Sequence, residues 1–519
     1  QFGIRSLEFS PEFGFKLNGK KIFLQGNANH HDLGALGATC YDKAIERMML
    51  QLKSFGYNCI RCSHNPYSDS FARIADRVGI LVVDELTDKW SDNDYWGGRQ
   101  PFTHIWHKLI TEWIKRDRNR PSIILWSLGN ELQIREGWAG FEGTNDWGIT
   151  TYNIFNQLVK RWDHTRLTTV AMFPARTRAI TRHDKEFNDY LVPPELACAT
   201  EVASFNYQSD KYDAYLKYKP DLILFQSEAE TSNLLQPYYN MDRKRTVGMA
   251  YWGSAEYWGE SNKWPKKGWN YSFFDHTMRP YPQAYLIKSA FMPEIPEVHI
   301  GVVDAAGAES VNWNDVIVGR MALNECWNHT PGSRRSLFTF TNAHSVELLV
   351  NGQSMGIQEN DTTRANLRNM IYWKDVPYGN GGSVVAIARD KSGKEVARHR
   401  IETAGKAVAL RIEAETPTDW KADGMDLQYI NVTVIDKKGR PVWDYNEPLT
   451  LQMEGAARLV ALDNGDHYTD ELFHGITSKR MYQGRMQIIL RSDQEAGNVT
   501  VKISSAGLKG TLRLKTIKE

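Results

Sequence analysis

The chain has 519 residues, too many for one hydrophobic core, so two to four domains are expected. Its 63 Lys and Arg balance 62 Asp and Glu, which gives no electrostatic reason to expect nucleic acid or an anionic membrane as a partner. No apolar run is long enough to predict a membrane-spanning segment. Five scattered Cys do not indicate a disulfide framework, and Cys59-Ile60-Arg61-Cys62 lacks the second pair that a zinc site would need.

Aromatic residues are frequent, with 17 Trp and 23 Tyr, and several Trp stand in polar, glycine-rich surroundings. Sugar rings present flat C–H faces that stack on indole rings, so this composition suits a carbohydrate cleft. Ordinary burial of large aromatic side chains explains it equally well. Composition alone therefore leaves both interpretations open.

Strand and helix patterns alternate from the N-terminus to residue 291. An Asn18-Gly19 turn between two extended segments predicts a hairpin at the start. The predicted strands are one that includes Phe23, then residues 58–62, 80–84, 122–126, 167–171, 202–207, 222–226 and 247–252. The predicted helices are residues 42–55, 68–78, 104–119, 146–162, 211–218 and 281–291.

Repeated strand–helix units predict parallel strands joined by right-handed crossovers. Eight such units in a segment of this length match a (β/α)8 barrel, known as a TIM barrel. An open doubly wound sheet is the alternative, but no G-x-G-x-x-G follows the first strand. The sequence therefore favours the barrel.

After Pro293 the helical periodicity ends, and short alternating segments separated by turn residues follow, which is typical of β-sandwiches. The fold class is thus α/β, a TIM barrel followed by two all-β immunoglobulin-like sandwiches. The predicted domains are an extended lead-in over residues 1–16, the barrel over 17–293, and sandwiches over 294–405 and 406–519.

Two carboxylates follow buried strands of the predicted barrel. Glu131 ends the run that begins at Ile123, and Glu228 ends the run that begins at Leu222. The carboxyl ends of barrel strands meet over one mouth, where catalysis takes place. A pair of carboxylates there can cleave a glycosidic bond, one as proton donor and one as nucleophile. Either residue alone could be a structural carboxylate at the rim, but both at strand ends favour the catalytic pair.

Other polar and aromatic residues follow the same strands. Asn130 could hold a substrate hydroxyl or cap the following turn, and Tyr207 could fix the rotamer of Glu228 or be an ordinary buried Tyr. Trp252, at the end of the eighth strand, is a sugar-stacking platform or a core Trp. Glu230 and Glu256 are rivals to Glu228, which is preferred because it comes first after its apolar run.

The segment His30-His31-Asp32 and the residue His64 follow the first two strands and suggest metal ligation at first sight. This spacing is a weak signal, and His at strand ends more often donates hydrogen bonds to substrate. Asp84 and Arg61 are assigned to an internal ion pair rather than to chemistry.

Taken together, several motifs resemble the barrel of glycoside hydrolase family 2, the family of β-galactosidases, β-glucuronidases and β-mannosidases. They are Phe23-Leu24-Gln25-Gly26, His30-His31-Asp32, Arg61-Cys62-Ser63-His64-Asn65-Pro66, Leu81-Val82-Val83-Asp84-Glu85, Arg116-Asp117-Arg118-Asn119-Arg120-Pro121-Ser122 and Trp126-Ser127-Leu128-Gly129-Asn130-Glu131. This ordered series spans residues 1–292. The segment Val346-Glu347-Leu348-Leu349-Val350-Asn351-Gly352 resembles the C-terminal modules of Bacteroidetes β-galactosidase-like members, with lower specificity.

The resemblance implies a retaining double displacement in which Glu131 is the acid/base and Glu228 the nucleophile. It implies that the glycon subsite is lined by His30, His64, Asn130, Tyr207 and Trp252, and we add Asp32 and Trp264 to the expected substrate-binding residues. The resemblance implies no organic cofactor, and the sequence shows no specific ligand set for a metal ion.

The resemblance is incomplete in places. Ser227-Glu228-Ala229-Glu230 differs from the Glu-Tyr-Gly form of many members, and Glu256 stands where relatives usually have Asp. The family's N-terminal domains are missing, and the chain begins at Gln1 without Met, so we interpret it as a fragment or processed product.

The expected function is therefore an exo-acting retaining β-glycosidase, first a β-galactosidase and second a β-glucuronidase. Asn262-Lys263 and Lys266-Lys267 offer basic groups that a uronate could use. A non-catalytic carbohydrate-binding remnant is the alternative of another class, and a metal-dependent hydrolase on the same barrel is a third. The expected partner is an oligosaccharide or a polysaccharide-derived glycan. A homo-oligomer is left open, and a periplasmic or extracellular compartment is favoured over the cytoplasm.

Overall fold

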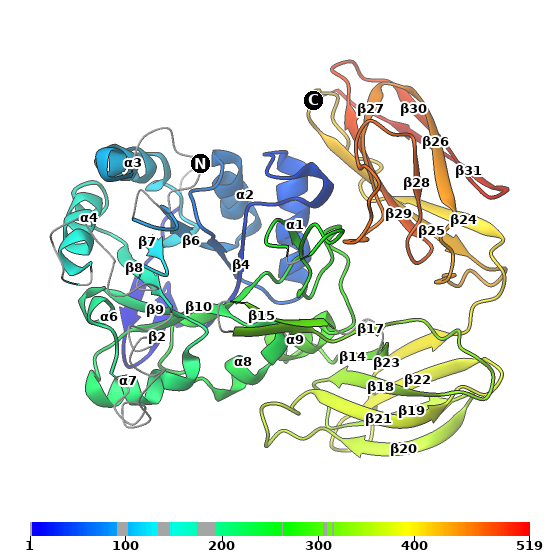
Figure 1. The fold of residues 1–519 in the computed structure, drawn as a ribbon, viewed down its shortest axis with the longest axis horizontal. Helices are drawn as coiled ribbons and strands as arrows, with labels where there is room; N and C mark the ends of the chain where they lie inside the picture. Colours follow the sequence, from blue (N-terminus) through cyan, green and yellow to red (C-terminus); the bar gives the residue numbers. More distant parts are fainter. Residues whose placement is uncertain are drawn as a thin grey trace. The chain divides into compact units, whose positions relative to one another are not determined.

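The computed structural model describes residues 3–90, 102–132, 146, 148–173, 192–261, 263–304, 309–313 and 316–518 (Figure 1). The chain divides into two compact units. Unit 1 comprises residues 1–31, 49–254 and 312–318, and unit 2 comprises residues 32–48, 255–311 and 319–519.

Unit 1 contains a closed barrel of eight strands in the order β10-β11-β4-β5-β6-β7-β8-β9. Every neighbouring pair is parallel, and β11 pairs with β4 to close the ring. The strands are β4 (Leu24–Asn29), β5 (Cys59–Cys62), β6 (Leu81–Glu85), β7 (Ile123–Asn130), β8 (Leu167–Met172), β9 (Val202–Asn206), β10 (Leu224–Ala229) and β11 (Gly248–Trp252). The predicted TIM barrel is confirmed.

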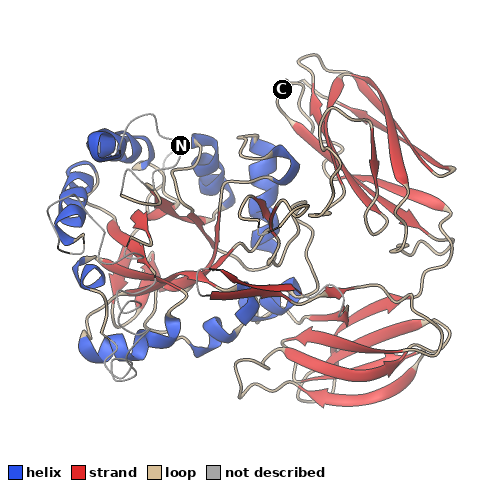
Figure 2. Cartoon of the chain, in the orientation of Figure 1, coloured by secondary structure: helices blue, strands red, loops and turns tan. Residues whose placement is uncertain are grey.

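Along the chain, helices alternate with these strands, and Figure 2 shows the helices in blue and the strands in red. The described helices are α1 (Asp42–Ser54), α2 (Asp69–Val78), α3 (Phe102–Asp117), α4 (Ile149–Trp162), α6 (Glu195–Ala199), α7 (Tyr212–Tyr218), α8 (Gln236–Asn240) and α9 (Ala284–Phe291). Helix α2 shows how local sequence sets the ends of a helix. At its start the Ser68 hydroxyl accepts a hydrogen bond from the Phe71 amide, and at its end Gly79 adopts φ +77°. Among the described helices, none has both the length and the apolar character to cross a membrane.

Short two- and three-stranded sheets complete this part of the chain. The strands β1 (Leu7–Ser10), β2 (Gly14–Leu17) and β3 (Lys20–Lys21) form one sheet, and the Asn18-Gly19 hairpin turn is confirmed with both residues at positive φ. The strand β12 (Tyr257–Trp258) pairs with β13 (Gly268–Trp269), and β15 (Glu309–Trp313) pairs with β16 (Val316–Arg320).

Two β-sandwiches follow in unit 2, each made of two four-stranded sheets around its own core. The first has the sheet β17 (Leu323–Asn324), β14 (Val298–Val303), β18 (Arg334–Thr341), β21 (Met370–Pro377) and the sheet β20 (Gln353–Glu359), β19 (Ser345–Val350), β22 (Ser383–Arg389), β23 (Glu395–Glu402). The second has β24 (Ala409–Ala414), β25 (Leu427–Ile435), β29 (Arg485–Ser492), β27 (Ala457–Asp463) and β28 (Ser478–Arg480), β26 (Pro448–Gly455), β30 (Asn498–Ser505), β31 (Leu508–Lys515). Successive side chains of a strand point to opposite faces, so every second residue of β30 packs inward. Val499, Val501 and Ile503 are buried in the second core.

Pairs of four-stranded antiparallel sheets are the architecture expected from the alternating C-terminal sequence. The exact domain limits at 293/294 and 405/406 stay a prediction. Of the aromatic residues in polar surroundings, Trp96, Trp138 and Trp147 lie outside the described residues.

Candidate active site

Strand β7 presents Glu131 at the carboxyl end of the barrel. All eight residues of the strand are buried, and its pairing with β8 shifts in register between Ser127 and Asn130. Directly after the strand, Glu131 has φ +49°, and its amide donates to the Ala171 carbonyl at 2.7 Å. A left-handed backbone costs roughly 1 kcal/mol or more in a non-Gly residue, and such conformations cluster at functional sites.

Strand β10 presents Glu228 at the same end. Its pairing with both neighbours also shifts in register around this residue. Tyr207, directly after β9, has φ +59°, and its amide donates to the Glu228 carbonyl at 2.8 Å. Register shifts of this kind re-aim side chains next to active sites, so two neighbouring strand ends are shaped around one carboxylate.

The Glu228 carboxylate is buried and held by two donors. The Arg61 guanidinium donates to Oε1 at 2.7 Å, and the Tyr207 hydroxyl donates to Oε2 at 2.5 Å. The predicted hydrogen bond from Tyr207 is therefore present. Both donors stabilise negative charge on the carboxylate and fix its rotamer, which suits a nucleophile.

Arg61 corrects the sequence-based assignment, because it pairs with Glu85 and Glu228 and not with Asp84. Its Nε and a terminal nitrogen donate to Glu85 at 3.0 and 2.7 Å. Asp84 points away from this network and accepts from the Trp113 indole at 2.7 Å, and burial followed by the charge of Asp117 raises its pKa. Successive strand residues face opposite sides, so only one of the acidic pair on β6 can point into the barrel.

The carboxyl group of Glu131 is tuned toward a proton donor. Burial, followed by the negative charge of Glu228, raises its pKa from 4.5 to about 8. Lys89 acts in the opposite direction, as does the Asn206 amide, which donates to Glu131 at 3.1 Å. Acid–base cleavage of a glycoside requires one carboxyl group that keeps its proton near pH 7 and a second that is held in place as a carboxylate. Glu131 and Glu228 fit these two roles.

Asn130 connects the groups around this pair. Its amide oxygen accepts from Arg61 at 2.9 Å and from Asn206 at 3.0 Å, and its NH2 group donates to Asp88 at 3.1 Å. The same nitrogen lies 3.2 Å from Nε2 of His64. These contacts give Asn130 a place inside the cluster rather than a role confined to capping the turn.

Three rings form an aromatic wall beside the carboxylates. Trp252 stacks on His64 with ring centroids 5.2 Å apart, and His30 meets both rings edge-on. Nδ1 of His64 lies 2.6 Å from Glu85, and its Nε2 lies 3.8 Å from Glu228. His31, by contrast, packs against Tyr67.

A pocket of about 700 Å³ opens beside this wall, a volume within the usual range for ligand sites. It shares His30 and His64 with the cluster and continues past Asp88 and Lys89 to Trp113 of α3. Glu131 and Glu228 are not part of its lining, so we regard it as room next to the carboxylates.

The structure thus brings together seven predicted site residues in unit 1: His30, His64, Asn130, Glu131, Tyr207, Glu228 and Trp252. Sequence reasoning missed the polar network around Glu131 and Glu228, which is formed by Arg61, Glu85, Asp88, Lys89 and Asn206. Their position at strand ends was the available signal, but their partners are distant in sequence.

The other two predicted substrate-binding residues, Asp32 and Trp264, belong to unit 2. Asp32 accepts hydrogen bonds from the backbone of Gly34 and Trp258 at 2.8 and 3.2 Å, and burial raises its pKa. Trp264 is 75% exposed. Their part in substrate binding stays a prediction.

The two rivals to Glu228 have other partners. Glu230 accepts a hydrogen bond from the Asn233 side chain, and burial raises the pKa of Glu230 to about 7. Glu256 lies in unit 2, where His276 and His467 contact its carboxylate. Within the described residues, the groups of His, Cys, Asp and Glu close enough to share a metal ion all lie in unit 2.

Comparison with known proteins identifies two parts of one family. Residues 12–247 match the model for the TIM barrel domain of glycosyl hydrolases family 2, and residues 410–512 match the model for C-terminal domain 5 of glycoside hydrolase family 2. Residues 332–397 match a domain of unknown function.

Individual relatives agree with these matches. A β-galactosidase of Bacteroides ovatus is 27% identical over 98% of this chain and 63% of its own length. A β-glucuronidase of Streptococcus agalactiae is 35% identical over 27% of this chain and 25% of its own length. A glycosyl hydrolase family 2 member of Bacteroides cellulosilyticus has a TM-score of 0.86 at 28% identity, covering 100% of this chain and 65% of that one. The chain therefore spans less than two thirds of the length of these relatives.

Proposed function

Because this chain belongs to glycoside hydrolase family 2, we propose that it hydrolyses terminal β-linked sugars as a retaining exo-β-glycosidase, with β-D-galactosides as its substrates. The observation that carries this proposal is that two carboxyl groups in different surroundings stand at the carboxyl ends of β7 and β10, on the same mouth of the barrel. Burial and Glu228 raise the pKa of Glu131, while Arg61 and Tyr207 hold Glu228 by hydrogen bonds.

The proposed reaction has two steps. First, Glu228 attacks the anomeric carbon as Glu131 protonates the departing glycosidic oxygen, which gives a covalent glycosyl–enzyme and a free aglycone. Next, Glu131, now ionised, takes a proton from water as the water attacks the anomeric carbon, which releases the sugar and Glu228. Asn130, His64 and Trp252 are proposed to contact the sugar, because they border the same carboxylates.

The galactoside assignment rests on the Bacteroides ovatus β-galactosidase, which matches nearly the whole chain. A β-glucuronidase is the second candidate, supported by the Streptococcus agalactiae relative. Of the basic residues expected for a uronate, Lys266 is buried and lies 3.8 Å from Glu309, so its charge is already paired.

A panel of p-nitrophenyl β-glycosides tests the proposal, with wild type beside Glu228→Ala and the control Glu230→Gln. We expect turnover of the galactoside by wild type and by the control, and loss of turnover in Glu228→Ala. Preference for the glucuronide would change the assigned sugar to glucuronate and leave the proposed mechanism unchanged. Turnover that survives in Glu228→Ala contradicts the assigned nucleophile, and a folded chain that is silent on every glycoside favours the carbohydrate-binding alternative.

A further inference from the structure

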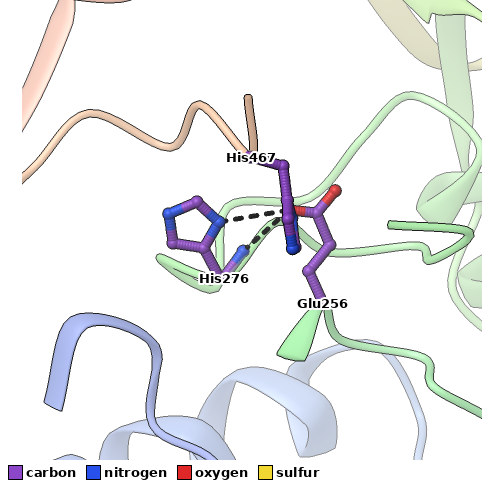
Figure 3. Close-up of side chains that lie close together, drawn as sticks. All are labelled: Glu256, His276 and His467. Carbon is purple, nitrogen blue, oxygen red and sulfur yellow. Dashed lines mark hydrogen bonds and ion pairs between the residues drawn. The ribbon is translucent and has the colours of Figure 1, made fainter. Parts of the chain in front are cut away.

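Three potential metal ligands converge in unit 2, outside the site described above. Oε2 of Glu256 lies 2.8 Å from Nδ1 of His467 and 3.2 Å from Nδ1 of His276. Figure 3 shows the three side chains together, with a ring nitrogen of His276 directed at the Glu256 carboxylate. All three side chains are buried, and one ligand atom from each lies within 4.8 Å of the others.

The groups behind these ligands hold them in a geometry suited to an ion. The second carboxylate oxygen of Glu256 is occupied by the Tyr281 hydroxyl at 2.8 Å and by Arg320 at 3.3 Å, so Oε2 alone faces the imidazoles. The other nitrogen of His276, Nε2, lies 2.8 Å from the Asp463 carboxylate. A carboxylate that accepts from one imidazole nitrogen leaves the lone pair of the other free, which is the usual outer arrangement of a metal-bound His.

The surroundings of the imidazoles are also suited to a closed metal site. The Trp258 ring packs against His276 and His467, with centroid separations of 4.6 and 4.9 Å. Nε2 of His467 is buried and has no hydrogen-bond partner within the described parts of the chain, so its ring is oriented from the Nδ1 side alone. A cavity of about 20 Å³, lined in part by Glu256, His276 and Asp463, has room for one water molecule.

The ligand types select the ion. Two imidazole nitrogens and one carboxylate oxygen suit zinc and neighbouring transition metals, whereas magnesium and calcium prefer oxygen ligands throughout. Ligands about 2.1 Å from a tetrahedral zinc ion lie about 3.4 Å from one another. The observed separations of 2.8 and 3.2 Å therefore require only a small outward adjustment.

We propose that Glu256, His276 and His467 bind one Zn²⁺ ion, with a water molecule as fourth ligand. The ion joins residues 256–276 to the loop that follows β27 in the C-terminal sandwich, so its role is structural. This site is separate from the proposed glycosidase chemistry, and its test does not depend on turnover.

A second cluster, His299, Glu325 and His399, is less suited to an ion and provides the control. Nδ1 of His399 accepts a hydrogen bond from the Ile300 amide at 3.1 Å, so Nε2 carries the proton when the ring is neutral. That proton faces Glu325, the residue that a metal would have to share.

The alternative to a metal ion in the first cluster is a set of hydrogen bonds between Glu256, His276, His467 and Asp463. The carboxylates of Asp463 and Glu256 raise the pKa of His276 despite its burial, so a doubly protonated ring could bridge them without a metal. A proton bridge predicts no stoichiometric zinc binding. Metal titration therefore separates the two states.

The experiment uses the full chain, stripped with a chelator and then titrated with Zn²⁺ by calorimetry and with Co²⁺ by visible absorption. We expect one equivalent of each metal per chain, a tetrahedral Co²⁺ spectrum, and a higher melting temperature with Zn²⁺. His467→Gln and His276→Gln should weaken binding at least tenfold, and His399→Gln should leave it unchanged. Wild type that binds no stoichiometric metal overturns the proposal even if a variant fails to fold, as does binding of unchanged affinity in folded His467→Gln.

Discussion

The pKa of Glu131 makes a direct prediction about the pH dependence of glycosyl transfer to the enzyme. This step needs Glu131 protonated, and its pKa is raised to about 8. The kcat/KM value should therefore be insensitive to Glu131 below that pH and fall about tenfold for each further pH unit above it. An unperturbed glutamate would lose its proton near pH 4.5 and leave little acid at neutrality.

Burial and the negative charge of Glu228 together raise the pKa of Glu131. The difference between 4.5 and about 8 corresponds to roughly 5 kcal/mol, at about 1.4 kcal/mol per tenfold. Two carboxylates about 5 Å apart, as retaining glycosidases require, repel by about 3 kcal/mol at an effective dielectric constant of about 20. Replacing Glu228 by Gln should therefore lower the pKa of Glu131 by about two pH units, while burial still holds it above 4.5.

Two measurements check this prediction. The kcat/KM profile of the wild type on an aryl β-galactoside gives the basic limb, and Glu230→Gln should leave that limb in place because Glu230 is not among the groups that shift Glu131. In Glu228→Gln, a ¹³C titration of labelled glutamate, assigned by difference from the Glu228→Gln/Glu131→Gln double variant, gives the pKa directly. A Glu131 that titrates near 4.5 in the wild type, or whose pKa is the same with and without Glu228, refutes the reasoning.

Three further substitutions test the roles of individual groups. Glu131→Gln should lower kcat/KM by about 10²- to 10⁴-fold for aglycones that need protonation, and far less for dinitrophenyl glycosides, so equal losses on both would contradict the acid role. Tyr207→Phe removes a hydrogen bond to the charged Glu228, which is worth about 1.5–3 kcal/mol. The variant should stay folded and lose about 10- to 100-fold in kcat/KM. Unchanged kinetics would exclude a positioning role for Tyr207. Arg61→Met leaves Glu85 and Glu228 without their buried partner and should cost about 3–5 kcal/mol in denaturant unfolding, so a variant as stable as wild type would show that the ion pairs are not needed.

The barrel could be predicted from the sequence because each strand is a short apolar run and most neighbouring runs are separated by a helical pattern. The runs at Ile123 and Leu222 predict both strands, although β7 continues to Asn130, and β10 begins at Leu224 and continues to Ala229. Beyond these runs the strands include buried polar residues such as Ser127, Asn130 and Glu228, so the apolar pattern ends before the strand does.

The position of Glu131 and Glu228 at the barrel mouth is predictable for the same reason, since a residue directly after a buried strand lies at that mouth. The network around these two residues is not predictable in this way. Arg61 and Glu228 are separated by 167 positions, and no local pattern connects them. The acidic pair Asp84 and Glu85 is the instructive error, because strand alternation places one outside and one inside, and only the register of β6 with its neighbours decides which.

The central claim is that Glu228 is the nucleophile of a retaining mechanism, and covalent trapping tests it most directly. The full chain is treated with a 2-deoxy-2-fluoro-β-galactoside that carries a good leaving group, then digested and mapped by mass spectrometry. The proposed mechanism predicts time-dependent inactivation and one fluorosugar on the peptide that contains Phe225 to Asn233, attached at Glu228. Attachment at Glu230, or continued hydrolysis of an aryl galactoside with inversion and no adduct, would contradict it.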